Sequence, residues 1–135
     1  MANDISHTAF VQRAYDDTYA LLLSMRDYVS GCSSTDARAL DPTDRLRLTR
    51  ELSRITRLLT EVMAWLMVQK AVAAGEISEI EAANAPAARL AFLMEDGDGD
   101  LEGLGRLPLP VRSLIDRARR IAALVRQLDD SIAAR

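Results

Sequence analysis

The chain has 135 residues and a formal net charge of −3, and 49% of its residues are hydrophobic although only 4% are aromatic. A chain of this length can bury a single core, so one domain over residues 1–135 is expected. Abundant Leu and Ala with little Gly or Pro favour an all-α fold, and the acidic balance argues against a general nucleic-acid binder.

The first helix is predicted over about residues 8–29, where apolar side chains recur at helical spacing. Ser30 and Gly31 end it, and the small polar residues of 31–35 predict a loop. The second helix is predicted over residues 42–74, because Asp41 can cap its first turn and Pro42 suits the first helical position.

The second predicted helix changes character along its length. An inner apolar stripe has spacings of four and three and consists of Leu48, Leu52, Ile55, Leu59, Val62 and Leu66. The opposite side carries first Arg47, Arg50, Arg54 and Arg57, and then Trp65, Val68 and Val72. Because the second half is apolar nearly all round, something must cover it. Its three rear residues are a candidate dimer or partner surface, and the alternative cover is residues 86–108.

The arginine stripe is a candidate docking site for acidic chemistry. It can bind an acidic partner, a phosphate backbone or the chain's own acidic residues 95–102. Alternatively, the stripe is an ordinary solvated face without a binding role. A nucleic-acid or phosphate binder using this stripe is therefore the alternative function.

A short helix is predicted over residues 79–84, because Ser78 and Glu81 form a capping box and Pro86 follows. Residues 86–109 predict an irregular connection, and the last helix is predicted over residues 110–133. Three long helices joined in this way predict an antiparallel three-helix bundle of up-down-up type, with the connection across one end or side.

Residues for catalysis and metal binding are scarce. His7 is the single histidine and Cys32 the single cysteine, which removes histidine-based zinc sites, nucleophile activation and an internal disulfide. No catalytic, cofactor-binding or metal-binding residue is predicted, and the chain is not expected to be an enzyme. The amino terminus lacks a secretory signal and the longest apolar run is too short for a bilayer, so a cytoplasmic protein is expected.

The acidic residues Asp96, Asp98 and Asp100 alternate as in a calcium loop. An EF-hand would need Gly at the position of Leu101 and a bidentate Glu at the position of Leu107. The segment is therefore predicted to be a solvated acidic turn.

The run from Leu58 to Ile77 resembles the alphaproteobacterial family named for the regulator of CtrA degradation, the RcdA type. Weaker matches follow in the same order along the chain at Pro86 with Arg89-Leu90, Leu107-Pro108, Leu114-Ile115 and Leu128-Asp129. The resemblance implies a three-helix-bundle homodimer without enzymatic activity, serving as an adaptor in regulated proteolysis. The motif residues Trp65, Gln69, Gly75 and Pro86 look mostly structural.

The same resemblance implies protein partners. Family members are linked to the AAA+ protease ClpXP, to a response-regulator-like protein that primes it, and to the delivery of cell-cycle substrates, often at the cell pole. Members continue into a polar tail, whereas this chain stops soon after its last helix. If partners are recruited through that tail, this chain is expected to keep the fold without the delivery role.

Overall fold

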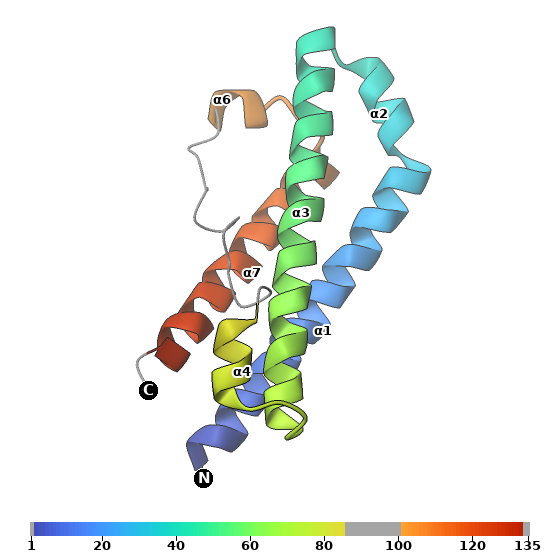
Figure 1. Ribbon diagram of the computed structural model, residues 1–135. Coiled ribbons are helices and arrows are strands. Elements are labelled where there is room, and N and C mark those ends of the chain that lie inside the picture. The colour runs from blue at the N-terminus through green and yellow to red at the C-terminus, as the bar shows by residue number, and fades with distance from the viewer. Residues whose placement is uncertain (1, 86–100, 134–135) are drawn as a thin grey trace.

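The computed structural model describes residues 2–85 and 101–133, and three long helices dominate them (Figure 1). The long helices are α1 (Ala2–Gly31), α3 (Pro42–Ala73) and α7 (Leu109–Ala133). Three short helices accompany them: α2 (Ser33–Ala39), α4 (Glu79–Asn84) and α6 (Leu101–Leu104). No strand occurs in these two ranges, so the predicted all-α class and the three-helix bundle are confirmed.

The direction of the last long helix differs from the prediction, because α7 runs parallel to α3. Asp44 near the start of α3 pairs with Arg106 just before α7, and Trp65 in the second half of α3 hydrogen-bonds Asp129 in the last turns of α7. The connection leaves α3 at the end of the bundle where α4 lies and re-enters at the opposite end through α6 (Figure 1). Up-down-up topology follows from short connections, and this connection is long enough to return along the bundle.

The bounds of helix α3 agree with the prediction because both of its ends carry strong capping signals. At the first turn, the Asp41 carboxylate accepts a hydrogen bond from the Asp44 amide at 2.8 Å. At the last turn, Gly75 adopts a φ of +75°, and the Glu76 amide donates to the Ala71 carbonyl at 2.9 Å. This pattern is the Schellman cap that glycine favours.

Helix α2 corrects the loop predicted over residues 31–35. Contacts with both neighbouring helices hold this segment in helical form. The Tyr28 hydroxyl donates to the Asp36 carboxylate at 2.8 Å, and the Arg45 guanidinium donates to the Ala37 carbonyl at 3.0 Å. Burial raises the pKa of the Tyr28 hydroxyl and the bond to Asp36 raises it further, so this hydroxyl remains a donor. Composition alone gave no sign of these contacts.

The core lies along the line where α1, α3 and α7 meet. The predicted inner stripe of α3 is buried except for Leu52, which is partly exposed. The largest fully buried apolar side chains come from all three helices and are Leu21, Leu59, Val62, Trp65, Leu66, Val111 and Val125. These contacts position the outer faces of α3 and α7 side by side, where the candidate site is found.

Candidate functional site

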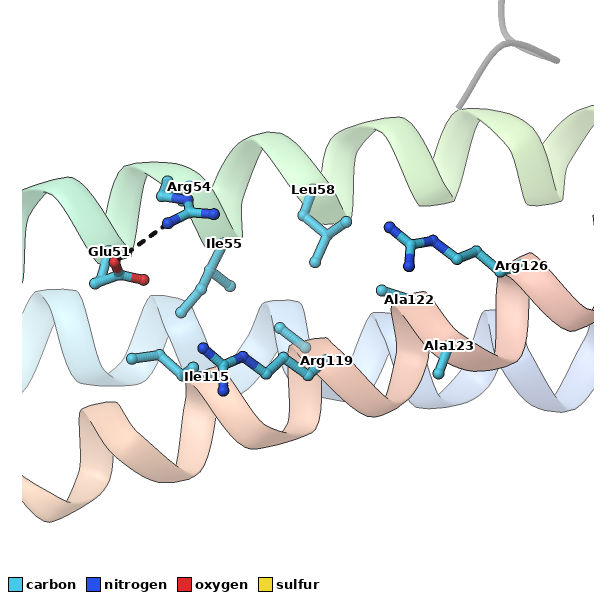
Figure 2. Close-up of a pocket in the computed structure, with 10 residues that line it drawn as sticks. Glu51, Arg54, Ile55, Leu58, Ile115, Arg119, Ala122, Ala123 and Arg126 are labelled. Atoms are coloured by element: carbon cyan, nitrogen blue, oxygen red, sulfur yellow. Dashed lines mark ion pairs between the residues drawn. The ribbon is translucent and has the colours of Figure 1, made fainter. Parts of the chain in front are cut away.

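A groove of about 250 Å³ runs between α3 and α7 on the side of the bundle away from α1 (Figure 2). Its lining comes from Glu51, Arg54, Ile55 and Leu58 of α3 and from Ile115, Ala118, Arg119, Ala122, Ala123 and Arg126 of α7. The apolar floor is hollow because two of the residues of α7 that face α3, Ala118 and Ala122, are alanines. Larger side chains there would fill the space, since helix interfaces normally close to crystal-like density.

The rim of this groove is positively charged. Arg54 stands on α3, and Arg119 and Arg126 stand on α7, whereas Glu51 is the only acid among the lining residues that the structure describes. Glu51 is 8% exposed and pairs with Arg54 across 3.6 Å. The side chains of Arg119 and Arg126 extend toward the N-terminal end of α7, Arg119 beside Ile115 and Arg126 beside Ala122 (Figure 2), as expected for helical side chains that lean toward the helix N-terminus.

The structure divides the predicted arginine stripe among three environments. Arg47 pairs with Asp44 at 2.6 Å, and its guanidinium lies so close to α6 that a Cβ on Gly103 would collide with it. Arg54 stands on the groove rim, while Arg50 and Arg57 are exposed. Acids one turn away in the same helix balance the charges of the first and third arginines. This pairing weakens the attraction to phosphate that the alternative function requires.

The structure corrects the candidate surface of Trp65, Val68 and Val72 at one residue, because Trp65 is buried. Trp65 is 1% exposed, and its indole N–H donates to the carboxylate of Asp129 on α7. The chain itself therefore covers this side chain, because the parallel α7 lies beside the second half of α3. Val68 and Val72 are half-buried and keep part of their surface.

Sequence reasoning missed the contribution of α7 to this groove. No residue of the helix predicted over residues 110–133 was named as a candidate site residue. The available signal was a cluster of small residues, Ala118, Ala122 and Ala123, on the same part of the helix as two arginines spaced by two turns. This pattern indicates a groove only when α3 is known to lie opposite that face of α7.

The described residues contain no group of three or more His, Cys, Asp or Glu side chains that could hold a metal ion. The acidic turn at residues 96–100, considered above as a calcium loop, lies outside the described residues, as does most of the predicted irregular connection. In the described part of the chain, no helix is long and apolar enough to cross a membrane.

The carboxyl group that accepts from Trp65 has an unusual environment. Burial raises the pKa of Asp129 above its ordinary value, the Trp65 N–H lowers it in part, and the neighbouring Asp130 raises it further. The native state therefore keeps this proton to a higher pH than the unfolded chain does. Stability consequently falls as pH rises from the unfolded pKa through the native one.

Replacing Asp129 by Asn is expected to remove this share of the pH dependence, since the amide does not titrate and its oxygen can still accept from Trp65. The free energy of unfolding at neutral pH should equal or exceed that of the wild type. Urea unfolding across a pH series measures the effect, with the exposed Asp17→Asn as the matched control. Identical pH profiles for the two variants would contradict this account of Asp129.

Together these features define an all-helical bundle protein with a groove between two parallel helices. The chain belongs to the family described as protein of unknown function (DUF1465), whose profile matches residues 2–135. Among solved structures it is similar to RcdA from Caulobacter crescentus CB15, with 26% identity and a TM-score of 0.67 over 91% of this chain and 90% of that chain. No curated protein matches it. The resemblance to the RcdA type noted from residues 58–77 is confirmed.

Proposed function

We propose that this chain is a non-enzymatic adaptor that binds other proteins and regulates their proteolysis. The observation that supports this role is the likeness to RcdA, which extends over nine-tenths of both chains at 26% identity and is reinforced by the family match. A shared fold does not by itself establish a shared function, because one fold hosts many functions. The groove between α3 and α7 supplies a physical site at which such an adaptor can hold a partner.

The partners in this proposal are an AAA+ protease, a response-regulator-like protein and a substrate protein, and the place of action is the cytoplasm, at the cell pole. Homodimerisation belongs to the same proposal. The proposed dimer surface is smaller than the sequence predicted, because it no longer includes Trp65. Val68 and Val72 keep part of their surface, and the neighbouring Met67 is 60% exposed. Apolar surface of this kind favours association when several residues are contiguous.

A pull-down from native lysate with the tagged, full-length chain tests the adaptor role. We expect recovery of protease subunits, of a response regulator, or of both, and no recovery with an unrelated helical bundle of similar charge. Recovery of neither partner would overturn the proposal. Sedimentation of the purified chain at tens of micromolar tests the dimer, and a strictly monomeric mass would remove that part.

A further inference from the structure

The size of the groove between α3 and α7 points to side chains of a partner as its occupant. Its volume of about 250 Å³ lies below the roughly 300–1,000 Å³ of sites that enclose cofactors or drug-sized molecules. It is lined on both sides by helices, and its floor consists of Ile and Leu side chains with alanines. A few apolar side chains projecting from one face of a helix would fill such a space.

The charge on the rim points to an acidic partner. Arg119 and Arg126 are exposed, and no acidic side chain in the described part of the chain pairs with either of them. Together with Arg54 they give the described part of the lining three positive charges against the one negative charge of Glu51. The whole chain has a net charge of −3, so this positive rim is a local feature and not a reflection of overall composition.

The spacing of the two α7 arginines adds a geometric constraint. Arg119 and Arg126 are separated by two helical turns, about 10.5 Å along the axis at the usual rise of 1.5 Å per residue. An α-helix lying along the groove matches this spacing with acidic residues seven positions apart. Apolar residues at the third and fourth positions between them would then face the floor.

We propose that the groove binds an amphipathic helix of a partner protein, with its apolar face against Ile55, Leu58 and Ala122 and its acidic residues paired with Arg119 and Arg126. This inference rests on the proposed adaptor function and names the chemistry of the partner at one site. A nucleic-acid backbone fits less well, because it would leave the apolar floor uncovered. Charge complementarity therefore selects an acidic, amphipathic polypeptide segment.

A labelled synthetic peptide is the probe for a direct test. It is a helix of about 18 residues, or five turns, with two Glu residues seven apart and two Leu residues between them. Matched peptides carry Lys in place of Glu, or Ser in place of Leu. Fluorescence anisotropy with the full-length chain should show binding of the Glu–Leu peptide, weakening with added salt, and at least about tenfold weaker binding of either control peptide.

Two groove variants locate the binding on the protein. Arg119→Glu combined with Arg126→Glu should weaken the Glu–Leu peptide at least about tenfold, and Ala122→Leu should weaken it by filling the groove. The matched control combines Arg13→Glu with Arg120→Glu, which changes the net charge equally at exposed positions outside the groove. Equal thermal unfolding midpoints establish that all variants are folded.

Several outcomes would overturn the inference. Binding that is equal in wild type and both groove variants, or equal for Glu and Lys peptides, excludes recognition at this groove. Binding that emerges only after Glu95, Asp96 and Asp98 are neutralised would assign the groove to the chain's own acidic segment. A pull-down with the Arg119→Glu, Arg126→Glu variant separates the two proposals. Unchanged recovery of protease or response regulator would contradict the groove inference but not the adaptor function.

Discussion

Replacing Trp65 by Ala is expected to lower the free energy of unfolding by about 3–5 kcal/mol, the usual cost of truncating a buried Trp. Trp65 is 1% exposed and lies where α3 meets the last turns of α7. Because domains of this size are stable by only about 5–15 kcal/mol, the variant should lose a large share of its stability. Urea unfolding followed by circular dichroism measures the loss.

Two further measurements separate burial within one chain from burial between two chains. Trp65→Phe retains most of the volume and loses the N–H bond to Asp129, so its cost should be about 1–3 kcal/mol. Since Trp65 is the single tryptophan, its fluorescence reports this site directly. Emission should stay at short wavelength on dilution. A red shift on dilution would place Trp65 at an interface between subunits. A cost of the Ala variant below about 1 kcal/mol would contradict the burial of Trp65 within the chain.

The sequence was sufficient for those elements whose ends carry local signals. The Asp41 cap and the glycine at position 75 delimit α3, and Ser78 with Glu81 delimits α4 over the predicted residues 79–84. The loop prediction for residues 31–35 was wrong because α2 depends on the side chains of Tyr28 and Arg45 from its neighbours. Contacts between elements override composition in a segment this short.

Topology and the candidate site could not be obtained from periodicity. An apolar stripe shows which face of a helix is buried but not which helix covers it or in which direction that helix runs. The sequence therefore predicted that the apolar second half of α3 is covered, but it did not predict that the parallel helix α7 covers it. For the same reason the Arg54 of α3 was predicted as part of a single-helix stripe, although it shares a rim with Arg119 and Arg126.

The start of α3 is tied to the approach of α7 by one carboxylate. The side chain of Asp44 is 9% exposed and lies 2.6 Å from the Arg47 guanidinium and 3.4 Å from that of Arg106. Its amide is also held by the capping carboxylate of Asp41. This arrangement lies at the end of the bundle where α3 begins and where α6 leads into α7.

Replacing Asp44 by Ala is expected to cost about 2–4 kcal/mol, because it removes the carboxylate that pairs with the largely buried Arg47. The value lies at the lower end for buried pairs because Arg47 keeps some exposure. Arg106→Ala is the control and should cost under about 1 kcal/mol, since that side chain is 60% exposed. Urea unfolding measures both. Equal small losses in both variants would show that the junction is not held by this carboxylate.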